Sequence, residues 1–491
     1  MTTSPPTTEP SGTAAEPSGN ASEPSGNASE PAGPIAEPSG NASEPSGPIA
    51  EPADPIPGPS GPIAGSSDTD AEPRADSRSP GGPAARRLRR LLDRLTPTDL
   101  RVLRLYLFTR LGLWLIAYAG AWLAPTGPDA RTPAPWLSRW EQWDWVHYQH
   151  IAQYGYFAPF PGIDTPHDNR VAFFPGFPLV LRAVHTLVPD WTAAGLLVSL
   201  VSGAVAVVAL ARIAGLGRPD GDAAGRLAGA FLLCSPAAVF LAAGYTESLF
   251  LAFALPAWLA AKHRNWPLAG LLTAAATTVR ISGLFLAAAI AAELLLALRT
   301  PDRPDDDDPS APTPTPAPVR GSALRWLRPL GWCLLPAVPA AAYTVYLRAH
   351  TGDWMAWKHA EERGWFRDFH TPAEAFRHTW QNAFGRLQSP GYAVEFQLEL
   401  AAMAVGVLLL AVLLIRRRWP EALYIALNLW ALGTSYWYLS IPRATLLWWP
   451  LWTGLAHWSL RRRWVKEAYA GVVAPLAVVI AVLFTSGRWA G

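Results

Sequence analysis

Long apolar runs, separated by short polar segments, occupy most of the chain after residue 100. About 20 apolar residues cross a bilayer as a helix, whereas a transmembrane strand alternates with a period of two. Because the runs are continuous and backbone groups in lipid must pair internally, helices are the expected elements. The pattern predicts an all-α, polytopic integral membrane protein with about 11 transmembrane helices. We place these helices at 102–123, 191–213, 227–245, 248–261, 266–279, 282–298, 327–348, 397–415, 421–440, 445–459 and 468–486.

The stretch 266–298 admits two interpretations, one long helix or two short helices broken near Arg280-Ile281-Ser282-Gly283. A helix of about 14 residues is short for a full span, which favours a single helix. Two helices keep the later basic loops on the cytoplasmic side, whereas one helix would invert every later segment. We therefore prefer two helices.

Residues 1–85 differ from the rest, because they repeat Glu-Pro-Ser-Gly-Asn-Ala-Ser with small variations. They contain too few large apolar side chains to offset the entropy of an ordered chain. We predict a disordered tail rich in Pro, Ser, Gly and Glu. The basic cluster Arg86-Arg87-Leu88-Arg89-Arg90 precedes the first span and should hold the tail in the cytoplasm. The multispanning membrane domain then covers 86–490.

A chain that starts in the cytoplasm and alternates sides places every strongly basic connection inside. The acidic, Pro-rich segment 300–323 becomes a disordered cytoplasmic linker, and its aspartate run reads as solvated charge. The segments 124–190 and 350–396 become extracytoplasmic loops of a multi-pass plasma-membrane protein. The inner basic residues are Arg212, Arg218, Arg226, Lys262, Arg264, Arg299, Arg303, Arg320, Arg325, Arg416, Arg417, Arg418, Arg461, Arg462, Arg463 and Lys466.

Composition agrees with this class of protein. Hydrophobic residues make up 50% of the chain and charged residues 16%, with a net charge of +2. The basic residues cluster between apolar runs, so they indicate topology, and we expect membrane lipids but no nucleic acid as partners. Cys234 and Cys333 lie in apolar segments and read as small core residues. No nucleotide-binding glycine loop occurs, which points away from a cytoplasmic nucleotide-sugar donor.

Five polar segments fall on the extracytoplasmic side in this topology. Ionisable groups near membrane depth are costly and usually functional, so their convergence predicts an active site on that face. The segments are the loop with Asp144 and His147, the turn Tyr245-Thr246-Glu247-Ser248, Arg280, the loop from His350 to Gln397, and Ile441-Pro442-Arg443.

A sugar carried on a lipid phosphate suits such a site. Its transfer needs a base for the acceptor hydroxyl, cations for the leaving phosphate and a water-poor aromatic surround. Asp144 is the candidate base, with His147 beside it as a second catalytic candidate. Arg280 and Arg443 are candidate phosphate partners, because a guanidinium fork matches phosphate oxygens. The other candidate substrate-binding residues are Glu247, Lys358, His359 and Trp143.

Each candidate also has a structural interpretation. Asp144 can cap the helix expected over 146–154, and Glu247 can be stabilised at a helix N-terminus. Arg280 and Arg443 can extend to the membrane interface. A divalent metal is an alternative at Asp144 and His147, although two ligands at helical spacing without a third nearby form an incomplete site.

Four motifs occur together. They are Trp143-Asp144-Trp145-Val146-His147-Tyr148 with its continuation to Tyr156, Ala172-Phe173-Phe174-Pro175-Gly176-Phe177-Pro178, Ser235-Pro236-Ala237, and Tyr245-Thr246-Glu247-Ser248-Leu249-Phe250. Their combination resembles the PIG-V family of mannosyltransferases over roughly residues 100 to 460. The resemblance implies the GT-C superfamily, whose multispanning, inverting glycosyltransferases use a polyprenyl-phosphate sugar. It also implies an acidic catalytic residue in the first external loop, where Asp144 lies. The family's Arg-Ser-Asn-Gly-like and Pro-Arg-Tyr-like elements appear in altered form, as Arg280-Ile281-Ser282-Gly283 and Pro442-Arg443-Ala444.

We therefore expect a membrane mannosyltransferase that moves mannose from a polyprenyl-phosphate donor to a lipid-linked or cell-envelope glycan acceptor. Two alternatives stay open. A flippase or transporter of lipid-linked saccharides would show internal repeats and polar residues on both faces. An O-antigen-type ligase would use the 350–396 loop and take its glycan from a lipid diphosphate.

Overall fold

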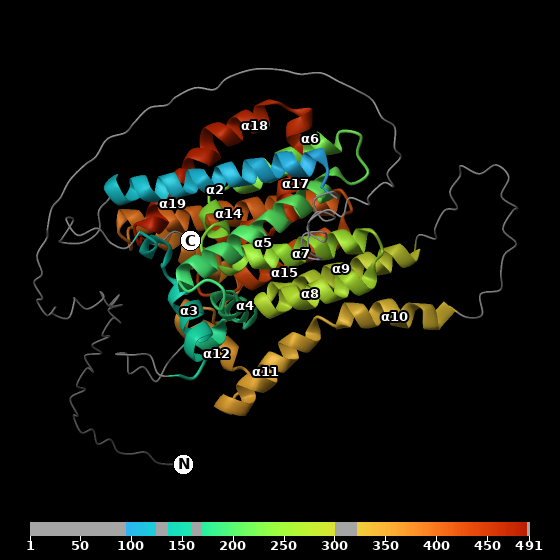
Figure 1. Ribbon diagram of the computed structural model, residues 1–491, viewed down its shortest axis with the longest axis horizontal. Helices are drawn as coiled ribbons and strands as arrows, with labels where there is room; N and C mark the ends of the chain where they lie inside the picture. The colour runs from blue at the N-terminus through green and yellow to red at the C-terminus, as the bar shows by residue number, and fades with distance from the viewer. Residues whose placement is uncertain (1–94, 124–135, 159–168, 300–321, 489–491) are drawn as a thin grey trace, which may run out of the picture. The chain divides into compact units, whose positions relative to one another are not determined.

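The computed structural model describes residues 95–123, 136–158, 169–299 and 322–488 (Figure 1). Every regular element in these ranges is a helix, which confirms the all-α prediction. The predicted tail, 1–85, and nearly all of the predicted linker, 300–323, lie outside the described residues.

Each of the 11 predicted spans contains a helix, but only six helical segments in the described ranges are long and apolar enough to cross a membrane. They cover 97–120, 191–215, 282–299, 328–351, 390–415 and 464–485. The other predicted spans hold helices of 13 to 17 residues. At about 1.5 Å per residue these are shorter than the hydrocarbon core. The count of 11 spans is therefore not confirmed.

Helices make up the membrane domain in the described residues, and the connections between them include both a two-residue turn and the two long predicted loops. α18 continues through a π-helical turn, Tyr469–Val473, into α19. The bounds are α2 Pro97–Leu123, α5 Trp191–Gly215, α6 Gly221–Leu233, α7 Thr246–Lys262, α8 Trp266–Val279, α9 Ser282–Arg299, α10 Ser322–Leu334, α11 Ala337–Thr351, α14 Pro390–Ile415, α15 Trp419–Gly433, α17 Trp449–Arg461, α18 Trp464–Ala468 and α19 Ala474–Thr485.

The stretch 266–298 forms two helices, α8 and α9, as predicted. Arg280 ends α8 in an extended conformation, with φ −150° and ψ 147°. A Cβ on Gly283 would overlap the backbone of Thr277, so a glycine is required for the tight turn. The two helices lie side by side in Figure 1, and Arg280 occupies the turn between them.

The two predicted extracytoplasmic loops contain short helices. The first includes η1 Ser138–Trp140, α3 Asp144–Tyr154, η2 Asn169–Ala172 and α4 Gly176–His185, and the second α12 Ala356–Trp365 and α13 Pro372–Phe384. The Phe173 carbonyl accepts hydrogen bonds from the hydroxyls of Tyr156 and Tyr343, at 2.8 and 3.0 Å. These bonds join the first loop to α11, and α3, α4, α11 and α12 lie near one another in Figure 1.

Candidate functional site

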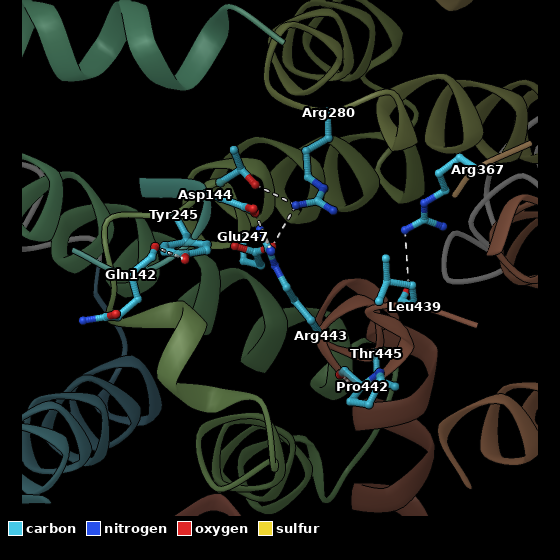
Figure 2. A network of polar contacts seen from close by, with 11 residues as sticks. Gln142, Asp144, Tyr245, Glu247, Arg280, Arg367, Leu439, Pro442, Arg443 and Thr445 are labelled. Carbon is cyan, nitrogen blue, oxygen red and sulfur yellow. Dashed lines mark hydrogen bonds and ion pairs between the residues drawn. The ribbon is translucent and has the colours of Figure 1, made fainter. Parts of the chain in front are cut away.

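Two carboxylates and two guanidinium groups form one ion network (Figure 2). Arg443 donates from Nη1 to Oδ2 of Asp144 at 2.6 Å and from Nε to Oε1 of Glu247 at 2.5 Å. Arg280 donates from Nη1 to the same Oε1 of Glu247 at 2.7 Å. The network joins the start of α3, the start of α7, the turn between α8 and α9, and the short helix α16, Ile441–Ala444.

Three side chains of the network are largely buried from solvent. The Glu247 side chain is 0% exposed, that of Arg443 8% and that of Asp144 13%. Buried charges are costly unless they are paired and hydrogen-bonded. Each of these carboxylates has a guanidinium partner, so the loss of Arg443 would leave two acidic groups with reduced compensation.

The start of α3 is fixed on both sides of Asp144. Trp143 has φ +49°, a region that disfavours residues with a side chain, and the helix begins at the next residue. On the other side, the Trp145 ring fills a gap between two backbone segments. A Cβ on either Gly195 or Gly244 would lie 2.5 Å from this ring, so both positions must be glycine.

Two aromatic side chains, Tyr245 and Phe240, contact the network at Arg443. The Tyr245 hydroxyl donates to the Gln142 carbonyl at 2.5 Å, which ties the residue before α7 to the segment before α3. The Arg443 guanidinium lies 4.8 Å from the Tyr245 ring centroid and 5.0 Å from that of Phe240. Cation–π contact of this kind is strongest where water is excluded.

Arg443 lies on α16, and a buried acid on α14 holds the start of this helix in place. Glu399 accepts hydrogen bonds from the backbone N–H groups of Ser440 and Ile441, at 2.7 and 2.8 Å. Ser440 has φ +62°, so the residue before α16, like the residue before α3, is in a strained conformation. Backbone strain of this type persists where the surrounding structure imposes it, often at functional sites.

A cavity of about 150 Å³ opens beside the network. All five polar segments singled out in the sequence contribute to its walls, which confirms their convergence; the side of the membrane it faces stays a prediction. The lining residues are Asp144, Tyr148, Ala172, Phe173, Phe174, Thr246, Val279, Arg280, Ile281, Ser282, Trp357, Glu361, Trp365, Arg367, Ser440 and Arg443.

Comparison with known proteins agrees with the motifs around this cavity. Residues 134–297 match the family "Mannosyltransferase (PIG-V)". GPI alpha-1,6-mannosyltransferase 2 of Rattus norvegicus is 34% identical over 179 residues, which are 34% of this chain and 34% of the relative. The protein of the same name from Mus musculus is 35% identical over 173 residues, 33% of each chain. That from Cricetulus griseus is 36% identical over 154 residues, 29% of each.

Residues 134–297, called the PIG-V segment below, are similar to the PIG-V mannosyltransferases. The chain spans about a third of the length of the curated relatives it matches. The PIG-V match includes Asp144, Glu247 and Arg280, whereas Arg443 lies beyond it. The ion network thus joins three residues of the PIG-V segment to one residue that the match does not reach.

Two candidates in the PIG-V segment lie beside the cavity without lining it. The His147 ring stacks on Phe173 with centroids 5.0 Å apart and meets Trp365 edge-on at 6.2 Å. Trp143 is 40% exposed and contributes its backbone conformation to the start of α3. Neither Trp143 nor His147 lines the cavity.

Two candidate residues on α12, Lys358 and His359, each contact a nearby acidic side chain. Lys358 forms an ion pair with Glu362 one turn later. The His359 imidazole contacts a carboxylate oxygen of Asp353 at 2.6 Å. The backbone N–H of Met355 and the His359 side chain lower the pKa of Asp353. Neither Lys358 nor His359 lines the cavity.

Four residues of the second loop line the cavity, although sequence reasoning did not select them. Trp357, Glu361 and Trp365 recur every four residues, so they share one face of α12, and this spacing was a usable signal. Arg367 had no such signal, because its position depends on Phe366, which ends the helix with φ +54°. Burial raises the pKa of Glu361, and the nearby Arg367 opposes that effect.

The described residues gather no group of three or more His, Cys, Asp or Glu side chains that could hold a metal ion. In the pair suggested for a divalent metal, Asp144 is bound to Arg443 and His147 stacks on Phe173.

Proposed function

We propose that this protein is a membrane glycosyltransferase that moves mannose from a polyprenyl-phosphate donor to a hydroxyl of a lipid-linked or cell-envelope glycan. The observation that carries the proposal is the Asp144 carboxylate, which belongs to the matched segment 134–297, lines the cavity and is bound by Arg443. The apolar helices around it suit lipid-linked substrates.

Asp144 is the proposed base. Its Oδ2 is bound to Arg443, while Oδ1 accepts no hydrogen bond from the described residues. As the acceptor oxygen attacks the anomeric carbon, its proton moves to this carboxylate. The bond from the anomeric carbon to the phosphate oxygen breaks, and its electron pair leaves with the polyprenyl phosphate. Attack from the face opposite the phosphate inverts the anomeric configuration.

The arginines take different proposed roles. Arg443 serves two carboxylates through Nε and Nη1, so it is suited to positioning Asp144 and not to binding phosphate. Arg280 lines the cavity, and its Nη1 donates hydrogen bonds to Thr246 and Glu247. Its Nε and Nη2 groups have no acceptor among the described residues. These donors are available for a phosphate oxygen.

The proposed setting is the plasma membrane, with the N-terminus in the cytoplasm and the cavity on the extracytoplasmic face. The basic connections between apolar segments support this orientation. A donor on a lipid reaches the site by lateral diffusion, so the proposal needs no soluble nucleotide sugar.

A transfer assay tests the proposal. Membranes with and without the protein receive radiolabelled polyprenyl-phosphate mannose, and the labelled product is isolated and identified. We expect label on a lipid or glycan acceptor only when the protein is present, with inverted anomeric configuration. Movement of intact donor across the bilayer without transfer would indicate a flippase, and a requirement for a lipid-diphosphate glycan a ligase. Either result would overturn the proposal.

A further inference from the structure

A third arginine, Arg367, also lines the cavity. Its Nη2 donates to the carbonyl of Leu439 at 3.2 Å. Its carboxylate neighbour, Glu361, lies 3.8 Å from Nε, beyond hydrogen-bond distance. By contrast, Arg443 contacts two carboxylates at 2.6 Å or less. Of the three arginines that line the cavity, Arg367 is therefore the one whose guanidinium makes no hydrogen bond to a carboxylate of the described residues.

The inverting reaction restricts where the donor phosphate can bind. The base and the leaving group must lie on opposite sides of the anomeric carbon. A phosphate on Arg443 would lie next to the Asp144 carboxylate, because that guanidinium is 2.6 Å from it. Like charges would then repel, and the phosphate would occupy the side that the acceptor needs.

Arg367 satisfies this restriction. Figure 2 shows Asp144 and Arg367 well apart, with Arg280 between them. A sugar between Asp144 and Arg367 would present one face to the base and the other to the phosphate. The hydrogen bond to Leu439, next to the strained residue Ser440, holds the Arg367 side chain in place before any ligand arrives.

The same loop supplies a surface for the sugar. Trp357, Glu361 and Trp365 form one face of α12 and line the cavity together. Indole rings suit the apolar faces of a hexose, and a carboxylate accepts hydrogen bonds from hydroxyl groups. Arg367 follows the end of α12 by two residues and lines the same cavity. This segment can therefore contact both the sugar and the phosphate of a sugar phosphate.

We propose that Arg367 binds the phosphate of the lipid-linked donor on the side of the cavity away from Asp144, with Arg280 as its second cation. This inference rests on the proposed function and adds a specific donor subsite to it. Arg367 contacts the leaving group, Arg443 positions the base, and the two arginines cannot replace each other.

Binding and transfer measured separately test the inference. Purified full-length protein in lipid nanodiscs is titrated with a polyprenyl monophosphate and with the neutral polyprenol of equal chain length. We expect wild type to prefer the phosphate, and Arg367→Gln to lose about 10- to 100-fold in phosphate affinity, as for one charge-assisted contact. Arg367→Lys should retain part of the preference. Arg363→Gln, an exposed arginine on α12, is the matched control and should bind as wild type does.

The outcomes separate the two claims. If Arg367→Gln and Arg367→Lys bind the phosphate as tightly as wild type, while wild type transfers mannose, the inference is wrong and the proposed function stands. If wild type neither prefers the phosphate nor transfers mannose, both are wrong. Asp144→Asn provides the complementary case, since it should keep phosphate affinity within about two-fold of wild type and lose transfer.

Discussion

At the scale of residues, the site depends on charges that are buried in pairs. Glu247 accepts from both Arg443 and Arg280 and is fully buried, so it is the shared centre of the network. Breaking a buried pair costs more than the pair contributes, because the remaining charge stays in a low-dielectric place. The network is therefore sensitive to the loss of any one member.

Arg443→Gln tests this sensitivity. It leaves Asp144 and Glu247 with less compensation, and we expect a loss of stability on the order of 3 kcal/mol. Thermal unfolding of the purified protein in detergent measures the change. Adding Glu247→Gln to Arg443→Gln should restore part of the loss. Arg416→Gln, at an exposed position, is the control, and equal melting temperatures for the two single variants would contradict this account.

Substitutions of Trp143 provide a second test, because they separate the role of its backbone conformation from that of its side chain. At φ +49° and ψ −114° a glycine is tolerated, whereas alanine carries a backbone strain on the order of 1 kcal/mol. We expect Trp143→Gly to be more stable than Trp143→Ala in thermal unfolding. A loss of transfer in Trp143→Gly, with stability kept, would show that the indole itself contacts substrate.

Sequence reasoning selected the four charged residues of the network but not their pairings. Ionisable side chains in an apolar chain are conspicuous, which is why Asp144, Glu247, Arg280 and Arg443 were identifiable. The contacts of Arg443 join residues 196 and 299 positions apart. Such pairings depend on how the helices pack, and a single sequence does not specify that packing.

At the scale of elements, close packing of α3 on α5 sets the position of Asp144. Gly195→Ala places a Cβ against the Trp145 ring, so α3 must shift or the ring must turn. We expect lower stability and at least a ten-fold loss of transfer, since displaced catalytic groups lose rate steeply. Gly454→Ala, with open space around its Cβ, should be neutral or slightly stabilising. Equal transfer in the two variants would contradict the packing argument.

The start of α13 should respond to pH. Thr371 and Glu374 form a capping box, and the backbone N–H and the hydroxyl of Thr371 lower the pKa of Glu374. A carboxyl with a lowered folded-state pKa stabilises the fold above its unfolded pKa, about 4.3, and the stabilisation is lost as pH falls through the folded value. The protection factors of the first-turn amides, which compare their exchange rates with those of an unstructured peptide at the same pH, should therefore fall with acidification below about pH 4.3. Glu374→Gln should remove this pH dependence; an unchanged profile would contradict it.

The helices themselves were predictable from apolar runs, while the number of full spans was not. The run 227–245 looked continuous, but α6 ends at Leu233 and is followed by the separate short helix η3, Ala238–Leu241. A proline in Ser235-Pro236 cannot continue the backbone pattern of α6. Hydropathy measures apolar content and does not register a break of this kind.

At the scale of the whole molecule, the proposed orientation can be measured directly. Single cysteines are placed at Val146, exposed near the site, and at Arg416, in a predicted inner loop, after Cys234 and Cys333 are replaced with alanine. A membrane-impermeant thiol reagent applied to intact cells should label position 146 and leave position 416 unlabelled until the cells are opened. The reverse pattern would place the site in the cytoplasm.

The central claim is that Asp144 is the base for mannosyl transfer in the PIG-V-like site. The most direct measurement is the single-turnover rate from radiolabelled polyprenyl-phosphate mannose, compared between wild type, Asp144→Asn and Asp220→Asn. Asp220 pairs with Arg218 on the surface and serves as the matched control. The account predicts that Asp144→Asn loses about 100-fold or more, the range for removing a general base, and that Asp220→Asn transfers at the wild-type rate. Transfer by Asp144→Asn at the wild-type rate would contradict it.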